Sequence, residues 1–539
     1  MSSANSGADA RTVDVVIVGA GFAGLHLLYR MRELGLSVQS FEAGGDVGGT
    51  WYWNRYPGAR CDSPSSSYQY FFSRELLEEW QWSQRFPPQS EALAYLNYVA
   101  DRFDLRDHIQ FDTRVVSAHY DEDRDRWRIE TDAGEILVTR FFISAIGVLT
   151  EPLVPDLPGQ DKARPKFLHT CRWPHGGVDF RGKRVGVIGT GATGIQVIQS
   201  IAGEVASLTV FQRTPNYAIP IRNPALDETD WQTRRDQADA THALTHETFS
   251  GFEYHLNPQS ALDVSDSERR AYLEELWADG SLSFWVGNYH DILASEAANA
   301  PVAEFVREKI RARVDDPATA EKLMPDYPYG SRRVPLENGY FEVYNQDNVT
   351  LIDVNEDPMQ AFTEQGIRTA SGEHKFDYIV LATGFDAVTG SYSRIDIRGR
   401  DGASLNAKWA QRPLAYLGIQ SAGFPNLFMV TGPTAPTTAF CNYPTCGGMQ
   451  VEWVTDCIRH LTRQGLTRIE PEPAAEVEWA DHVDEVANMT LIPATKSWWM
   501  GSNVGGKAHS VLGYIGGANE YKRICDEVAA ENYKGFETA

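Results

Sequence analysis

The sequence predicts an α/β fold with two parallel-sheet domains and a helical insertion. Two stretches, residues 13–42 and 183–215, each contain an apolar run, a glycine-rich turn, a helical pattern and a second apolar run. This order is that of a β–α–β unit, in which the two strands are parallel neighbours in one sheet. Between residues 223 and 324 glycines become rare and helical patterns dominate, which indicates the insertion.

The second unit predicts a binding site for NADPH. Its first strand leads into the turn Gly189-Thr190-Gly191-Ala192-Thr193-Gly194, and we expect the helix to begin near Gly194. Such glycines allow a tight turn and bring the backbone close to a pyrophosphate, which the positive end of the helix binds. The next strand ends in Gln212-Arg213-Thr214. An arginine here suits the 2′-phosphate of NADPH, whereas an NAD site has a carboxylate.

The first unit predicts a binding site for FAD. Its turn is Gly19-Ala20-Gly21-Phe22-Ala23-Gly24, and its second strand ends in Glu42, a carboxylate placed to accept two ribose hydroxyls. Because one site ends in Glu and the other in Arg, the chain binds two dinucleotides of different chemistry. The economical interpretation is a flavoprotein oxidoreductase with two Rossmann-like dinucleotide-binding domains, in which electrons pass between NADPH and FAD.

Length and charge limit the partners. A chain of 539 residues is long enough for two or three domains. A net charge of −24 argues against nucleic acid or an anionic membrane surface as a partner. No stretch approaches the ~18 consecutive apolar residues that a membrane-spanning helix needs, and the first residues lack the apolar core of a signal peptide. We therefore expect a cytoplasmic protein, monomeric or weakly homo-oligomeric, with no nucleic acid and no membrane as partner.

The six cysteines predict neither a disulfide framework nor a metal site, because they are scattered along the chain. Cys441 and Cys446 have the spacing of the redox disulfide in glutathione-reductase-like flavoenzymes. In those enzymes, however, the pair follows shortly after the first glycine turn, and here it lies in the last quarter of the sequence. We interpret both as ordinary loop or core thiols.

The loop after Glu42 is dense in glycine, aromatic residues and arginine. Such a loop is costly to order unless something flat and charged is bound against it. Its aromatic residues do not follow helical or strand spacing, so a simple core role does not explain them. A flavin fits, and the residues that we assign to it in this loop are Gly49, Thr50, Trp51, Tyr52, Trp53 and Asp62.

The same loop resembles that of a known family. Residues 48–62, GGTWYWNRYPGARCD, are similar to the motif GGxWxxxxYPGxxxD of type I Baeyer–Villiger monooxygenases at every defined position. The resemblance continues over nearly the whole chain. It implies an FAD-containing, NADPH-dependent monooxygenase that inserts one oxygen atom next to the carbonyl of a ketone, expected to be cyclic, to give an ester or lactone.

A second motif also resembles the family. The family fingerprint F-x-G-x-x-x-H-x-x-x-W-P is matched at His169, Trp173 and Pro174, and it differs at Ala163 and Pro165. A proline removes a backbone donor and fixes φ, so the chain must take a locally different path here. The family implies a structural or conformational role for His169.

The resemblance also implies which residues act. NADPH reduces FAD, and the reduced flavin takes up O2 as a C4a-peroxide that attacks the small-molecule ketone. Arg333 is the candidate for stabilising the negative charge, with Asp62 holding it. No side-chain nucleophile or metal is required. Residues 434–446 would lie over the flavin ring and shape the ketone pocket.

The residues assigned to each cofactor form two sets. The FAD set is Gly19, Gly21, Phe22, Gly24, Glu42, Gly49, Thr50, Trp51, Tyr52, Trp53, Asp62, Tyr68, Val115 and Asn442. In the NADPH set, Arg332 joins Arg213 on the 2′-phosphate, and Trp498 touches the cofactor from a mobile C-terminal loop. The whole NADPH set is Gly189, Thr190, Gly191, Ala192, Thr193, Gly194, Arg213, Thr214, Arg332, Arg333 and Trp498.

The resemblance also divides the chain into domains. The FAD-binding domain is expected in two parts, residues 1–150 and 382–539, the second of which contains the mobile loop. The NADPH-binding domain is expected at 151–222 and 330–381. The helical insertion, at 223–329, is expected to give surface and packing but no chemistry.

Three other functions compete with ketone oxidation. A monooxygenase of the same fold can oxidise nitrogen or sulfur, or act as an uncoupled NADPH oxidase; Trp173-Pro174 and Arg332-Arg333 speak against both. A flavin disulfide reductase would need its cysteine pair beside the first glycine turn. A non-catalytic nucleotide sensor does not explain the intact glycines together with Arg333.

Overall fold

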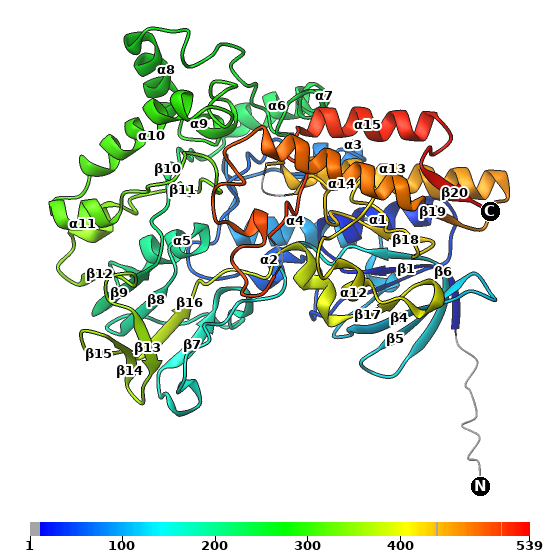
Figure 1. Cartoon of the computed structure of the whole chain (residues 1–539), viewed down its shortest axis with the longest axis horizontal. Helices are drawn as coiled ribbons and strands as arrows, with labels where there is room; N and C mark the ends of the chain where they lie inside the picture. Colours follow the sequence, from blue (N-terminus) through cyan, green and yellow to red (C-terminus); the bar gives the residue numbers. More distant parts are fainter. Residues whose placement is uncertain (1–10, 438–439, 508) are drawn as a thin grey trace.

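The computed structural model describes residues 11–437, 440–507 and 509–539. Two sheets lie side by side, an eight-stranded one and a five-stranded one (Figure 1). Helices α8 to α11 lie above the five-stranded sheet in this view, α6 and α7 lie at the top centre beside α15, and the long helices α13 to α15 lie above the eight-stranded sheet. The observed architecture is therefore α/β with a separate helical part, as predicted.

The eight-stranded sheet has the order β17-β4-β5-β6-β1-β2-β3, and β18 also pairs with β6. Its pairs are parallel except for β4–β5 and β5–β6. The second half of the inner strand β1 is apolar and buried on both faces, since Val15 and Ile17 belong to one hydrophobic cluster and Val16 and Val18 to another. The strands are β1 (Arg11–Val18), β2 (Val38–Phe41), β3 (Ile109–Gln110), β4 (Val115–Asp121), β5 (Arg126–Thr131), β6 (Ile136–Ser144), β17 (Asp396–Arg398) and β18 (Leu427–Met429).

The five-stranded sheet is entirely parallel, in the order β12-β9-β8-β16-β7. Its strands are β7 (Lys166–His169), β8 (Arg184–Ile188), β9 (Ser207–Gln212), β12 (Val349–Asp353) and β16 (Tyr378–Leu381). The remaining strands of the described residues form three small sheets. They contain β10 (Ile219–Pro220) with β11 (Leu336–Glu337), β13 (Met359–Phe362) with β14 (Gly366–Thr369) and β15 (Glu373–Lys375), and β19 (Ile469–Pro471) with β20 (Phe536–Thr538).

One predicted helix start can be compared directly with the structure. The helix after the second glycine turn begins at Ala192, two residues before the expected Gly194. The helices are α1 (Phe22–Glu33), α2 (Thr50–Trp53), α3 (Arg74–Glu79), α4 (Gln89–Arg102), α5 (Ala192–Ile201), α6 (Glu228–Asp236), α7 (Ala238–Glu247), α8 (Asp266–Asp279), α9 (Ser283–Val286), α10 (Glu296–Arg311), α11 (Pro317–Lys322), α12 (Leu405–Trp409), α13 (Tyr443–Gln464), α14 (Pro473–Asn488) and α15 (Ala518–Ala530).

Two crossovers join the sheets, one from β6 to β7 and one from β16 to β17. They lie against each other, because the backbone N–H of Leu153 donates to the carbonyl of Gly384 at 2.9 Å. Pro165 stands directly before β7, which is the edge strand of its sheet. The missing N–H of a proline is tolerated at such a position, which explains how the first crossover accommodates the departure from the family fingerprint.

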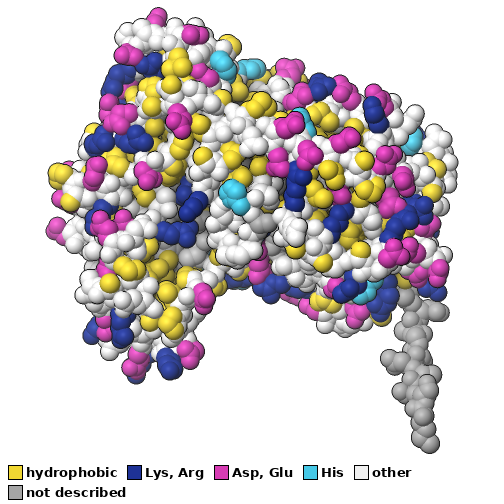
Figure 2. Space-filling model, viewed as in Figure 1, with side chains coloured by type: hydrophobic (Ala, Val, Ile, Leu, Met, Phe, Trp, Pro, Cys, Tyr) yellow, Lys and Arg dark blue, Asp and Glu magenta, His cyan; other side chains and the backbone are white. Residues whose placement is uncertain are grey.

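The surface carries no dominant patch of one charge on the face shown in Figure 2. Acidic and basic side chains are mixed there, and basic side chains lie beside the hollow between the two lobes. Within the described residues, no helix is both long and apolar enough to cross a membrane. The same residues contain no cluster of three His, Cys, Asp or Glu side chains suited to a metal ion.

Candidate active site

The first glycine turn brings β1, α1 and the end of β6 into backbone contact. Gly19 has φ +107°, and a Cβ on it would lie 2.4 Å from the carbonyl oxygen of Ala145. A Cβ on Gly24, in the first turn of α1, would lie 1.9 Å from the carbonyl oxygen of Gly19. The start of α1 has no side-chain cap and borders a cavity of about 270 Å³. Open N–H groups at a helix start suit an anion such as a pyrophosphate.

We expect Gly24→Ala to lower both flavin retention and thermal stability. The added methyl would overlap the carbonyl oxygen of Gly19, so α1 must move away from β1, at a cost of roughly 3 kcal/mol. The purified variant should carry less flavin per protein, measured by absorbance, and should unfold several degrees lower. Gly203→Ala is the matched control, because a Cβ there meets no atom within 4 Å. An equal flavin loss in both variants would contradict this reasoning.

Glu42 closes one end of this cavity at the carboxyl end of β2. Its Oε2 accepts a hydrogen bond from the backbone N–H of Ala20 at 2.9 Å, and its Oε1 accepts one from Gly44 at 2.7 Å. Burial raises the pKa of Glu42, although these backbone donors act in the opposite direction. Each carboxylate oxygen keeps a lone pair for a further donor, which is the arrangement that two ribose hydroxyls need.

Most of the predicted FAD residues line this one cavity. They are Gly19, Gly21, Phe22, Glu42, Gly49, Thr50, Trp51, Trp53, Tyr68 and Val115. The other four lie outside its lining. Gly24 packs helix on strand, Tyr52 accepts a hydrogen bond from Gly45, Asp62 pairs with Arg333, and Asn442 donates to the carbonyl of Ser67 at 2.9 Å.

The sequence analysis missed several lining residues, which reach the cavity from distant parts of the chain. They include Thr150, Glu151, Cys171, Arg172, Ser391 and Arg394. These residues come from the two crossovers and from the short helical turn that follows β7. No local pattern marks them, since only the packing of the two sheets brings them to the cavity. Tyr443, within the segment 434–446 that was expected over the flavin, also lines the cavity.

The second glycine turn repeats the geometry of the first. Gly189 has φ +108°, and its Cβ would lie 2.4 Å from the carbonyl oxygen of Ala382. A Cβ on Gly194 would lie 2.2 Å from the carbonyl oxygen of Gly189. Gly191, at the start of α5, has no side-chain cap and no atom within 4 Å of the Cβ position, so this helix start is also open. The turn therefore suits a second dinucleotide.

Two arginines form a cationic site near this turn. Arg332 lies over the ring of Tyr327 at 4.6 Å, and its Nε is buried without a hydrogen-bond partner. Burial lowers the pKa of Arg332, and the neighbouring charge of Arg213 lowers it further. No ion pair joins either arginine to a carboxylate in the part of the chain that the structure describes. Two neighbouring cations that form no ion pair with a described carboxylate fit a phosphate group.

Arg333 and Asp62 meet between the two sheets. Arg333 Nη2 lies 2.5 Å from Asp62 Oδ2, and the two side chains are only 19% and 27% exposed. The guanidinium carbon also lies 5.3 Å from the ring centre of Trp285, in α9 of the helical insertion. The insertion, expected to give only surface and packing, therefore also supplies a side chain that contacts the candidate catalytic arginine.

Three buried aromatic side chains, which we call the aromatic layer, lie together beside Arg333. Trp285 and Trp499 are stacked with ring centres 6.2 Å apart, and Phe440 contacts them at 5.2 and 4.5 Å. All three are less than 7% exposed. They come from residues far apart in the sequence; Phe440 lies in the segment 434–446 that was expected to shape the ketone pocket, whereas Trp285 and Trp499 were assigned no role. An apolar layer here limits the access of water to the guanidinium.

The C-terminal loop lies against the second crossover. Lys507 Nζ lies 2.5 Å from Asp386 Oδ1, and Asn503 donates to the carbonyl of Phe385 at 2.8 Å. Trp498 packs on a small apolar cluster that includes Val148, which also lines the first cavity. The contact of Trp498 with the nicotinamide cofactor stays a prediction.

His169 joins the two crossovers rather than entering the cavity. Its Nε2 lies 3.2 Å from the carbonyl oxygen of Leu153, and its Nδ1 accepts a hydrogen bond from the N–H of Cys171 at 3.3 Å. Burial lowers the pKa of His169, which favours the neutral ring. These contacts agree with the structural role that the resemblance implies.

The expectation for Cys441 and Cys446 is wrong. The structure joins them in a disulfide with a Cα–Cα distance of 6.3 Å. Helix α13 begins at Tyr443, and its first turn brings Cys446 back toward Cys441, which stands two residues before the helix. Of the described cysteines, Cys61, Cys171, Cys457 and Cys525 are free and buried.

The two glycine turns, one with a carboxylate and one with paired arginines, define a class of protein. They fit an oxidoreductase that binds FAD at the first turn and a 2′-phosphorylated nicotinamide dinucleotide at the second.

Comparison with known proteins narrows this class. The model of the flavin-binding monooxygenase-like family matches residues 12–220. Acetone monooxygenase (methyl acetate-forming) of Gordonia sp. (strain TY-5) is 47% identical, over 97% of this chain and 99% of that protein. Phenazine N-monooxygenase PhzNO1 of Lysobacter antibioticus is 40% identical, over 97% and 96% of the two chains.

A solved structure agrees with these relatives. The crystal structure of OTEMO in complex with FAD and NADP matches with a TM-score of 0.95 and 42% identity, over 98% of this chain and 100% of that chain. The chain therefore belongs to the Baeyer–Villiger monooxygenases of the flavin-binding monooxygenase-like family. Its cofactors are FAD and NADPH.

Proposed function

We propose that this chain converts a ketone into an ester or lactone with NADPH and O2, and that Arg333, held by Asp62, is its catalytic side chain. The observation that carries the proposal is the ion pair of 2.5 Å between them, which lies against Trp285. A fixed guanidinium stabilises an oxyanion much better in a water-poor site than in solution. The attack on a ketone carbonyl creates such an oxyanion.

The other site residues would bind and orient the cofactors. Reduced FAD supplies the oxygen-activating chemistry when it is bound. Glu42 would accept hydrogen bonds from the ribose hydroxyls, and the starts of α1 and α5 would each bind a pyrophosphate. Arg213 and Arg332 would bind the 2′-phosphate of NADPH. The aromatic layer would keep water from Arg333, which strengthens its interaction with a developing charge.

We assign the domains as the sequence predicts. The FAD-binding domain would comprise residues 1–150 and 382–539, which supply all strands of the eight-stranded sheet. The NADPH-binding domain would comprise 151–222 and 330–381, which supply the five-stranded sheet, with the insertion at 223–329. The cytoplasmic location and the monomeric or weakly oligomeric state stay predictions.

The test is turnover by the purified flavin-containing protein. NADPH oxidation and oxygen uptake would be followed with acetone, with cyclic ketones of increasing size and without a ketone, and each product would be weighed by mass spectrometry. A rate stimulated by ketone, with a product heavier by one oxygen, supports the proposal. Equal NADPH loss into hydrogen peroxide with every ketone would contradict it.

Nitrogen oxidation is the second candidate, favoured by the similarity to phenazine N-monooxygenase. The same assay with a heteroaromatic amine separates the two functions. An N-oxide formed without any ester or lactone from the ketones would select the second candidate.

A further inference from the structure

We infer that Cys441 and Cys446 are a reversible redox site, which hydrogen peroxide closes to a disulfide and a dithiol reductant opens, and whose closed form holds the aromatic layer beside Arg333. The inference rests on the proposed function for the source of the peroxide. It goes beyond that function because neither cysteine takes part in oxygen transfer to a ketone.

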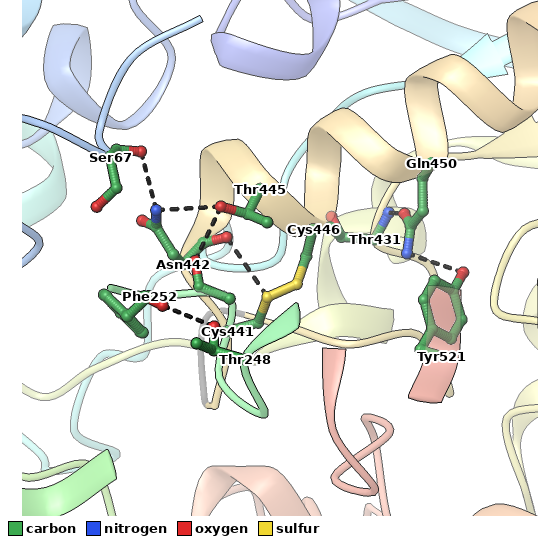
Figure 3. Close-up of a disulfide and its surroundings, with 11 residues drawn as sticks. Ser67, Thr248, Phe252, Thr431, Cys441, Asn442, Thr445, Cys446, Gln450 and Tyr521 are labelled. Carbon is green, nitrogen blue, oxygen red and sulfur yellow. Dashed lines mark hydrogen bonds between the residues drawn. A yellow bond between two sulfur atoms is a disulfide. The ribbon is translucent and has the colours of Figure 1, made fainter. Parts of the chain in front are cut away.

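The disulfide lies where three segments of the chain meet (Figure 3). Between its cysteines, Asn442 donates from its side chain to the carbonyl of Ser67 at 2.9 Å and from its backbone to that of Ser250 at 3.0 Å. Thr445 Oγ1 donates to the carbonyl of Gly251 at 2.9 Å. The disulfide therefore holds the start of α13 where the segment around Ser67 meets the helical insertion at Ser250 and Gly251.

The same bond lies next to the candidate active site. Phe440, the residue before Cys441, is the member of the aromatic layer that contacts both tryptophans. One of these, Trp285, contacts Arg333. With the disulfide closed, Phe440 is attached to the first turn of α13 through a covalent link one residue away. With the link open, the backbone bond from Cys441 N–H to the carbonyl of Thr437, at 3.1 Å, remains as a local restraint.

Oxidation should select this pair among the six cysteines. The thiolate is the form that reacts with peroxide. All six cysteines are buried, so burial does not distinguish the pair from the others. What distinguishes it is a neighbouring thiol, because none of Cys61, Cys171, Cys457 and Cys525 is bonded to a second cysteine. Cys441 and Cys446 are adjacent, so each can act as the resolving thiol for the other.

The closing reaction balances without any other reactant. One thiolate attacks the O–O bond of hydrogen peroxide, which gives a sulfenic acid and, after protonation, one water. The second thiol then attacks the sulfenic sulfur, the S–S bond forms, and the hydroxyl leaves as a second water. The two thiols supply the two electrons. A flavin monooxygenase produces the peroxide when NADPH reduces O2 without reaching a ketone, so the oxidant arises beside the pair.

The opening reaction requires a dithiol, which takes back the two electrons by thiol–disulfide exchange. The sequence predicts a cytoplasmic protein, and disulfides in that compartment are usually transient, catalytic or redox-sensing. Peroxide leakage would therefore close the pair and stabilise the water-poor site, and a fall in leakage would let cellular dithiols open it again.

The first test counts thiols in the flavin-containing enzyme and does not depend on ketone activity. The enzyme is fully reduced, freed of reductant, treated with one equivalent of hydrogen peroxide, denatured and alkylated, and its peptides are mapped by mass spectrometry. We expect six alkylated cysteines before peroxide and four after it, with Cys441 and Cys446 in one linked peptide. Six alkylated cysteines after peroxide, or oxidation at Cys61 or Cys171 first, would overturn the inference.

The second test compares the reduced and oxidised wild-type enzyme in turnover. Suppose that, with the disulfide open, the aromatic layer is ordered for about a third of the time. The KM for a bulky ketone should then rise about threefold, because only a third of the molecules are competent to bind it. The share of NADPH that ends as hydrogen peroxide should also rise about threefold. The double variant Cys441→Ser/Cys446→Ser should have the KM and peroxide share of the reduced enzyme, and reductant should change neither. In the control Cys525→Ser, both quantities should still change between the reduced and oxidised forms. Equal KM and peroxide share in both forms of the wild type would overturn the link to the active site. If peroxide joins Cys441 to Cys446 in a protein that oxidises no ketone, the proposed function is refuted and the redox site is not.

Discussion

Replacing Arg333 by alanine is expected to abolish most ketone oxidation while NADPH is still consumed. The variant loses the fixed positive charge that lies against Trp285, so an oxyanion at the ketone carbonyl has no counter-charge there. Loss of one such donor lowers kcat by about 10²- to 10³-fold in comparable sites. The measurement is ester or lactone formed per NADPH oxidised, with hydrogen peroxide counted separately.

Three further variants make this prediction specific. Arg333→Lys keeps the charge but not the planar fork, and it should retain intermediate activity. Asp62→Asn keeps the shape of the partner without its charge, so the guanidinium is held less firmly and activity should fall less than with Arg333→Ala. Arg412→Ala is the control, because this arginine pairs with Asp481 and Asp484 on a helix away from the site. An Arg333→Ala enzyme that keeps wild-type yield per NADPH would contradict the assignment.

The parts of the site that the sequence predicts are those built by short stretches of chain. Each glycine turn has a local part, because Gly24 and Gly194 pack against the turn directly before them, whereas Gly19 and Gly189 also lie against Ala145 and Ala382 in distant segments. Glu42 is also placed locally, at the end of its strand. The order of apolar runs then predicts two parallel sheets, and the structure contains both.

The parts that the sequence could not predict depend on packing between distant segments. Nothing near Trp285 indicates that α9 brings it to Arg333, because that contact depends on how the insertion docks. Cys441 and Cys446 were misinterpreted because the argument compared their position with another enzyme class. The start of α13 between them was the relevant signal, since a first helical turn returns the chain toward its cap.

The double substitution Arg213→Gln/Arg332→Gln is expected to remove most of the preference for NADPH over NADH. Burial, and then the charge of Arg213, lowers the pKa of Arg332, and neither arginine forms an ion pair with a carboxylate among the described residues. A phosphate relieves this repulsion and accepts charge-assisted hydrogen bonds, each worth about 1.5–3 kcal/mol. Each single variant should therefore lose roughly 10- to 100-fold in kcat/KM for NADPH.

NADH provides the internal control for this prediction. It lacks the 2′-phosphate, so its kcat/KM should change little in any of the three variants, and the pyrophosphate contacts at the start of α5 should be unaffected. Because both arginines would bind one phosphate, their effects should not add, and the double variant should lose less than the product of the single losses. A parallel fall in the efficiency of both dinucleotides would mean that the arginines shape the domain rather than bind the phosphate. A fall confined to NADPH would locate the 2′-phosphate between Arg213 and Arg332.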